Sequence, residues 1–245
     1  MLRIKNLSSS FQIVQSDCLQ FTQEIECRVN ELWQAALSHL DSRLFNGQIF
    51  TATSVNENAI VGTFVEYKYL IAQHLDPRLK PILNICPVSL LGFLTCQDGI
   101  LFGKRQNWVA TRSNEWGFLP SEYIGAETFS HDGQIDYVKA FLIALKNEIN
   151  VDAHFLNDLT HFALVEESSI QENHISIVMH ADIAMSSFAI KRAHISAMQD
   201  EYEQIKAVPT QDLGAFLNDE IGHDMAIAGT ILGEKGYLAL ESDCA

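Results

Sequence analysis

Residues 87–151 constrain the fold more than any other part of the chain. Residues 88–94 and 99–104 have strand character, and Gln97-Asp98 followed by Gly99 is typical of a hairpin turn between them. Further along, residues 134–149 carry apolar side chains three and four positions apart, the spacing of a buried helix face. These side chains are Ile135, Val138, Leu142, Leu145 and Ile149. The run therefore predicts two strands, a tryptophan-containing loop and a helix.

The loop of this run, Trp116-Gly117-Phe118-Leu119-Pro120, and the end of the helix resemble the Nudix superfamily. In that family a strand from tryptophan to proline leads into a box, G-x5-E-x7-R-E-U-x-E-E-x-G-U, where U is aliphatic. With Val151 at the last aliphatic position, Leu145 takes the earlier one and Glu148 takes the second glutamate of the E-E pair. The other positions differ: Phe129 for Gly, Ile135 for Glu, Ile143 for Arg, Ala144 for Glu, Asn147 for Glu and Asn150 for Gly.

The resemblance implies an α/β fold, a Nudix-type α/β/α sandwich with a mixed sheet. Residues 1–80 would form an N-terminal extension, a helix and a strand pair packed on the core, and residues 81–245 the core with its C-terminal helix. Segments 44–47 and 66–72 are similar to a branch of the family that hydrolyses UDP-sugars. No repeat, low-complexity tract or Gly/Ser-rich linker interrupts the sequence, which favours a single compact unit.

The resemblance also implies a metal, Mg²⁺ or Mn²⁺, because family members hydrolyse diphosphates with metal-held water. Magnesium needs several hard oxygen ligands, and helix residues three and four apart share one face. Here that face presents Ala144, Asn147 and Glu148, which is a poor site unless loops add oxygens. The candidate metal ligands are Glu148 and Asp136. For Asp136, a favourable interaction with the helix N-terminus is the alternative.

Further site residues follow from the same resemblance. Glu148, Glu166 and Glu167 are candidate catalytic residues, and Arg105, Trp116 and Glu122 are candidate substrate-binding residues. A guanidinium such as that of Arg105 can pair two phosphate oxygens. The alternatives stay open: Arg105 as a solvated strand-end residue, Glu166 and Glu167 in a solvated turn, and Trp116, like Trp108, in core packing.

Charge and cysteine content exclude several classes of protein. The net charge of −15, with no basic cluster to offset it, argues against nonspecific binding to nucleic acid or an anionic membrane. The five cysteines form no CxxC pair, which suits reduced thiols in the cytoplasm. The N-terminus has no apolar signal core, no stretch is long enough for a membrane span, and the histidine spacing fits no zinc motif.

The remaining elements are expected on both sides of this run. Strands are expected over 11–14, 48–55, 60–69, 162–166, 175–182 and 203–208, and helices from Ser16 or Asp17 to about Ser42, from Pro209-Thr210 through Leu217, and over 221–240.

Two functions fit these observations. The first is a metal-dependent Nudix-like hydrolase of a nucleoside diphosphate linked to another group, with activity weakened by the eroded box. The alternative is a catalytically inactive Nudix-fold protein that binds a nucleotide-like small molecule or a protein partner. A purely structural subunit is a third reading, and the resemblance alone implies a homodimer.

Overall fold

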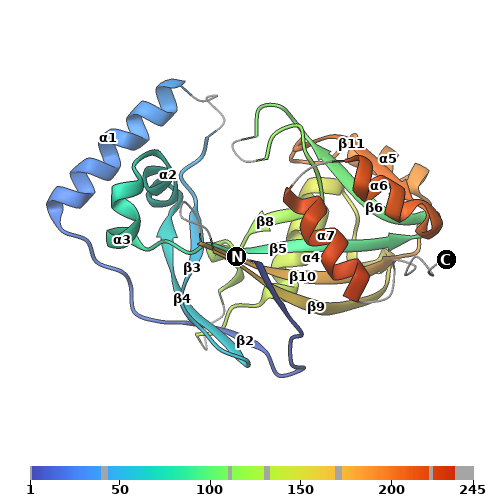
Figure 1. Ribbon diagram of the computed structural model, residues 1–245, viewed down its shortest axis with the longest axis horizontal. Helices are drawn as coiled ribbons and strands as arrows, with labels where there is room; N and C mark the ends of the chain where they lie inside the picture. Colours follow the sequence, from blue (N-terminus) through green and yellow to red (C-terminus); the bar gives the residue numbers. More distant parts are fainter. Residues whose placement is uncertain are drawn as a thin grey trace, which may run out of the picture. The chain divides into compact units, whose positions relative to one another are not determined.

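The computed structural model describes residues 2–39, 44–109, 112–129, 133–168, 173–220 and 223–234 (Figure 1). Its contacts divide the chain into two compact units. Unit 1 comprises Met1–Leu90, Glu122–Ala140 and Leu164–Ile177, and unit 2 comprises Leu91–Ser121, Phe141–Ala163 and Val178–Ala245. The division into residues 1–80 and 81–245 stays a prediction.

Strands and helices are interspersed along the chain. The strands are β1 Leu2–Lys5, β2 Gln12–Gln15, β3 Gln48–Val55, β4 Ala59–Glu66, β5 Val88–Cys96, β6 Gly99–Arg105, β7 Trp116–Gly117, β8 Ser121–Tyr123, β9 Leu156–Ser168, β10 Asn173–Ile183 and β11 Tyr202–Val208. The α-helices are α1 Gln23–His39, α2 Tyr67–Leu75, α3 Lys80–Leu83, α4 Tyr137–Ile149, α5 Ser187–His194, α6 Leu213–Asp219 and α7 His223–Glu234. Short 3₁₀ helices occupy Pro77–Leu79, Ala126–Thr128, Ala153–Phe155 and Thr210–Asp212.

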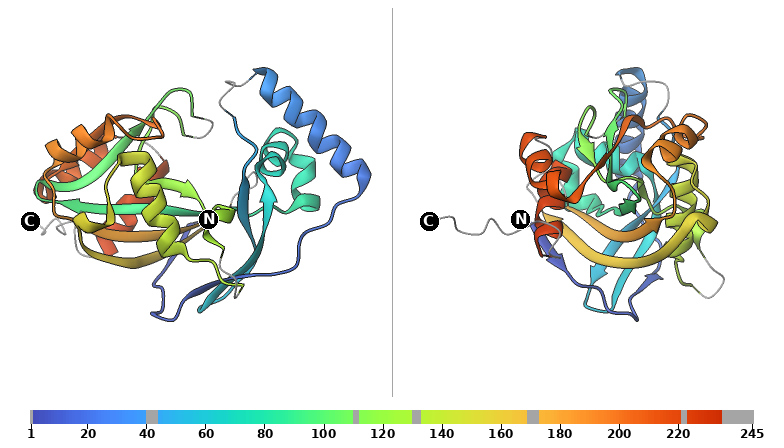
Figure 2. Two further views of the ribbon diagram at one scale, coloured as in Figure 1. Left: turned by 180° about the vertical axis from the view of Figure 1, so that it is seen from behind. Right: turned by 90° about the vertical axis from the view of Figure 1, so that its right-hand side faces the viewer.

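The strands form two sheets. The larger has eight strands in the order β1-β9-β10-β5-β6-β11, with β7 paired to β6 and β8 to β5. The smaller has the order β2-β4-β3, in which β2 runs parallel and β3 antiparallel to β4. In unit 2, α4 and α7 lie on opposite faces of the large sheet, as the opposed views show (Figures 1 and 2). The predicted α/β sandwich of helices around a sheet is confirmed.

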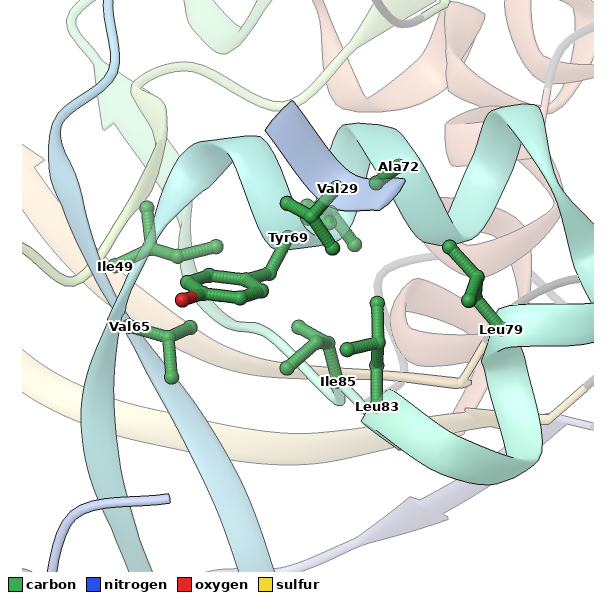
Figure 3. Close-up of a cluster of buried hydrophobic side chains, with 9 residues drawn as sticks. Val29, Ile49, Val65, Tyr69, Ala72, Leu79, Leu83 and Ile85 are labelled. Atoms are coloured by element: carbon green, nitrogen blue, oxygen red, sulfur yellow. The ribbon is translucent and has the colours of Figure 1, made fainter. Parts of the chain in front are cut away.

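Unit 1 has its core between α1, α2, α3 and the small sheet. Side chains from all of these elements point toward one another in Figure 3, where the Tyr69 ring lies beside Ile49 and Val65. The buried members are Val29, Ile49, Val65, Tyr69, Leu70, Ala72, Leu79, Leu83 and Ile85. The Tyr69 hydroxyl donates to the Glu26 carboxylate over 2.7 and 2.8 Å, so the one polar group of this core is satisfied.

Most expected elements are present, but helix α1 begins at Gln23 and not at Ser16 or Asp17, and β9 begins at Leu156 and not at Phe162. β3 has the predicted limits, and the hairpin β5–β6 pairs Cys96 with Gly99 across the turn. The strand expected to reach Tyr69 was too long, because the chain becomes helical at Tyr67. Helix α4 begins at Tyr137, and its predicted stripe was wrong at Val138, which is 39% exposed. The terminal helix runs to Glu234, and residues 235–240 of that prediction lie outside the described residues.

Two further observations concern membranes and thiols. None of the helices in the described ranges is long and apolar enough to cross a bilayer. Cys18, Cys27 and Cys96 are free thiols, Cys86 is half-buried, and Cys244 lies outside the described residues.

A buried carboxylate, Asp76, joins α1 to the turn after α2. Arg78 donates to both of its oxygens over 2.8 Å, and Arg28 of α1 donates over 3.1 Å. The hydrogen bonds from Arg78, and then from Arg28, hold the pKa of the Asp76 carboxyl well below its usual range. The ionised form is therefore favoured by folding.

We expect Asp76→Asn to lower the melting temperature at pH 7 by an amount that shrinks as the pH falls. A carboxyl with a depressed pKa in the folded state stabilises the fold above its unfolded pKa, about 3.9, and loses this effect as the pH drops toward the folded value. Thermal melts of both proteins from pH 7 to pH 3 measure the gap. Glu31→Gln is the control, because Glu31 is an exposed partner of Arg28 and should cost little. A constant gap over this range would contradict the assignment.

Candidate functional site

Glu148, the box carboxylate, points into the protein. It lies in the last turn of α4 and its residue is 0% exposed. Its Oε2 accepts a hydrogen bond from the Tyr202 hydroxyl at 2.7 Å and another from the Ser121 backbone N–H at 3.0 Å. A buried carboxylate is costly unless hydrogen bonds replace those of water, and these two bonds lower that cost at Oε2.

Tyr202 is the first residue of β11 and is almost fully buried. Its ring covers Gly103 of β6, where an added Cβ would lie 2.5 Å from the ring. Burial raises the pKa of the Tyr202 hydroxyl well above its usual range, and the negative charge of Glu148 raises it further. Tyr202 therefore stays protonated, and its hydroxyl donates a hydrogen bond to Glu148.

His194, the last residue of α5, extends these contacts. Its Nδ1 lies 2.8 Å from the carbonyl oxygen of Glu148, and its Nε2 lies 3.1 Å from the carbonyl oxygen of Tyr202. The Asn150 side chain donates to the Ala193 carbonyl over 3.1 Å. The end of α5 is thus tied to the end of α4 and to β11. We call Glu148, Tyr202, Ser121 and His194 the Glu148 anchor.

The box sequence keeps its structural positions. Leu145 and Val151, at the aliphatic positions, are buried. Asn150 stands where the family pattern has glycine, and its φ of 56° lies in the left-handed region. Asparagine is one of the few residues besides glycine that adopts this conformation readily at a helix end. Asn150 therefore ends the helix in the same left-handed conformation that a glycine would adopt.

The chemical positions of the box have changed. Ala144 is buried, and Asn147 is half-buried with its carbonyl accepting from the Gln199 N–H at 3.0 Å. Within the described ranges, no group of three or more His, Cys, Asp or Glu side chains is arranged to hold a metal ion. Of Ala144, Asn147 and Glu148 on this face of α4, Glu148 alone carries a carboxylate.

The other predicted carboxylates belong to unit 1, whereas Glu148 belongs to unit 2. Asp136 is exposed, and its Oδ1 accepts from the Lys139 N–H at 2.8 Å, the arrangement of a helix N-cap. Glu166 pairs with Lys5 at 2.6 Å, and Glu167 lies opposite Leu2 in the β1–β9 pairing. Glu122 is half-buried in β8. Their catalytic, substrate and metal roles stay predictions.

Arg105 and Trp116 lie in unit 2. Arg105 is opposite Tyr202 in the β6–β11 pairing and pairs with Glu201 at 3.1 Å, so Tyr202 is flanked by both Arg105 and Glu148. Trp116 is buried, with its ring 5.6 Å from that of Phe216 in an edge-to-face contact. This geometry favours the packing alternative for Trp116, and the substrate role of both residues stays a prediction.

The sequence pattern did not predict Tyr202, His194 or Ser121 as partners of Glu148. The last strand was expected from residue 203, one position too late to include Tyr202. One signal was available: a tyrosine on the inward side of a strand usually needs a partner for its hydroxyl. Ser121 acts through its backbone N–H, so its side-chain type carries no signal.

In comparisons with known proteins, no protein-family model and no curated protein matches the sequence. The chain is similar in structure to Tm1382, a candidate Nudix hydrolase, with 12% identity, a TM-score of 0.49, and 84% of this chain and 96% of that one covered.

Two other similar structures come from named bacteria. The NUDIX domain of NrtR from Shewanella oneidensis, complexed with ADP ribose, has 14% identity and a TM-score of 0.46 over 67% of this chain and 97% of that one. A bifunctional NMN adenylyltransferase/ADP ribose pyrophosphatase from Francisella tularensis, complexed with AMP and a manganese ion, has 15% identity and a TM-score of 0.42 over 67% and 49%.

We expect Gly103→Ala to destabilise the protein by about 1–3 kcal/mol, because the new methyl group would meet the Tyr202 ring at 2.5 Å. Gly214→Ala is the matched control: its Cβ would meet nothing within 4 Å, and alanine is the better helix former by about 1 kcal/mol. Urea unfolding should give shifts of opposite sign for the two variants. Equal midpoints would show that Tyr202 does not require the space above Gly103.

We expect Tyr202→Phe to destabilise by about 1–3 kcal/mol, because it removes one partner of a buried carboxylate. Tyr137→Phe is the control, since the half-buried Tyr137 hydroxyl donates to the Phe11 carbonyl over a longer 3.5 Å. Urea unfolding measures both. If Tyr202→Phe lowers the free energy of unfolding no more than Tyr137→Phe does, the Tyr202 hydroxyl does not stabilise the Glu148 anchor.

Proposed function

We propose that this chain is a catalytically inactive Nudix-fold protein that acts by binding a partner. The observation that carries this proposal is the Glu148 carboxylate, which is buried and bonded to Tyr202 and Ser121. Both bonds fall on Oε2, so a metal would have to bind the other oxygen, Oε1, which is buried as well and out of reach of solvent. Opening the core around Glu148 to admit a hydrated ion would be costly, and this cost opposes a role as a metal ligand.

The neighbouring positions support the same reading. Hydrolysis of a diphosphate in this way requires a divalent ion that orients water and offsets charge on the leaving phosphate. The positions beside Glu148 on the helix carry the methyl group of Ala144 and the amide of Asn147. Neither is an anionic oxygen donor, so α4 contributes packing where a hydrolase of this kind needs carboxylates.

Of the two ligand classes that the sequence left open, a protein partner is favoured over a nucleotide-like molecule. Arg105, the candidate phosphate contact, already forms an ion pair with Glu201 at 3.1 Å. A phosphate would have to compete with that carboxylate on a chain whose net charge is −15.

We expect neither Mg²⁺ nor Mn²⁺ to raise the melting temperature in a saturable manner, because a ligand stabilises only a fold that binds it. Thermal-shift titrations with each ion, with and without UDP-glucose or ADP-ribose, measure this, together with assays of phosphate-bond hydrolysis.

Metal-dependent hydrolysis would contradict the proposal and support the hydrolase. Two variants would then locate the ion. Glu148→Gln removes the carboxylate, whereas Tyr202→Phe disturbs the anchor but leaves that carboxylate in place. Loss of activity in the first with retention in the second would assign Glu148 as a ligand, and loss in Glu166→Gln or Glu167→Gln would place the ion at β9.

A further inference from the structure

Helix α5 presents an unusual face in unit 2. Phe188, Lys191, Arg192 and Ile195 recur at spacings of three, four and seven residues, which places them on one side of a helix, and all four are exposed. Phe188 is 68% exposed and Ile195 is 83% exposed, and Met198, three residues further on, is 84% exposed. Single exposed apolar residues are ordinary, but here Phe188 and Ile195 share one side of the helix and Met198 follows three residues later, which calls for an explanation. We call these five residues the α5 face.

The α5 face is held on a fixed support. The Ser186 hydroxyl caps the helix by accepting from the Ala189 N–H at 3.3 Å, and Asp98 accepts from the Ser187 N–H at 2.6 Å. Ile190, on the opposite side, is fully buried. His194 ties the far end to the Glu148 anchor. A preorganised helix loses little conformational freedom when it binds, which suits a docking surface.

The charge of the α5 face is opposite to that of the whole chain. Lys191 and Arg192 lie in its last turn with His194, and its first turn has no acidic residue. The chain as a whole has 16 Lys and Arg against 31 Asp and Glu. Lys191 also acts on Asp98, whose pKa is lowered first by the hydrogen bonds from Ser187 and then by this charge. A local positive face on an acidic protein selects partners by charge more than a neutral patch would.

We propose that the α5 face docks an acidic amphipathic helical segment of a partner protein. Apolar side chains of that segment would cover Phe188, Ile195 and Met198, and its carboxylates would pair with Lys191 and Arg192. A second copy of this chain is a poorer occupant, because a twofold contact would bring the same basic residues together. The proposal rests on the proposed binding function and names its partner class.

Two synthetic peptides test the charge rule. Both carry the same leucine stripe at helical spacing, one with glutamates and the other with lysines at the flanking positions, and both bear fluorescein. Fluorescence anisotropy with the full chain should show that the glutamate peptide binds and that added salt weakens it. Equal binding of the two peptides, or none, would overturn the proposal.

Two sets of variants test the site. Lys191→Glu with Arg192→Glu should lower the affinity for the glutamate peptide by about tenfold and raise the affinity for the lysine peptide. Phe188→Ser with Ile195→Ser should weaken both peptides. These side chains are exposed, so thermal melts should show the fold intact. Lys80→Glu with Lys139→Glu in unit 1 is a charge-matched control that should change neither affinity. Binding that persists in both sets of α5 variants would overturn the assignment.

A third arm separates a protein partner from a lipid surface. Vesicles of phosphatidylcholine with phosphatidylserine, measured by flotation, should not retain the protein. Retention lost in Lys191→Glu with Arg192→Glu, together with no peptide binding, would overturn the proposal in favour of a membrane surface. The metal and hydrolysis assays fail separately: hydrolysis with selective peptide binding would refute the inactive state and leave the α5 face standing.

Discussion

The Glu148 carboxylate lies inside the protein, where the Tyr202 hydroxyl and the Ser121 N–H donate to its Oε2 in place of water. Three other features depend on this exchange. Tyr202 can reach the carboxylate because Gly103 leaves room for its ring. Its proton is retained because burial and the nearby charge of Glu148 both raise its pKa. The ring nitrogens of His194 form hydrogen bonds with the backbone carbonyl oxygens of Glu148 and Tyr202, which joins α5 to the same centre.

The box helix therefore separates two properties that the family pattern combines. The residues that shape the helix remain: Leu145 and Val151 are buried, and Asn150 provides the left-handed end. The residues that would supply oxygens to a metal are replaced by Ala144 and Asn147, and the remaining carboxylate stabilises the core. A helix with this composition can hold other elements in place without taking part in a reaction, and the α5 face is one surface that it supports.

Periodic and local signals predicted much of the fold. The hairpin of β5 and β6, the strand β3 and the position of α4 follow from alternation, turn residues and helical spacing, which depend on neighbouring residues alone. Val138 and the chain after Tyr67 were assigned wrongly, because the apolar character of a residue does not say which face of the tertiary structure covers it. The role of Glu148 was beyond reach for the same reason: its partners lie 27 and 54 residues away in the sequence, and one of them is a backbone group.

A double-mutant cycle on Glu148 and Tyr202 tests the central claim most directly. The free energy of unfolding is measured in urea for the wild type, Glu148→Gln, Tyr202→Phe and the double variant. If the two side chains stabilise the fold through their mutual hydrogen bond, the losses of unfolding free energy in the two single variants will add up to more than the loss in the double variant. The difference, the coupling energy, should lie between about 0.5 and 3 kcal/mol. Additive costs, together with a rise in melting temperature with Mn²⁺ that Glu148→Gln abolishes, would contradict this account and return Glu148 to the role of a metal ligand.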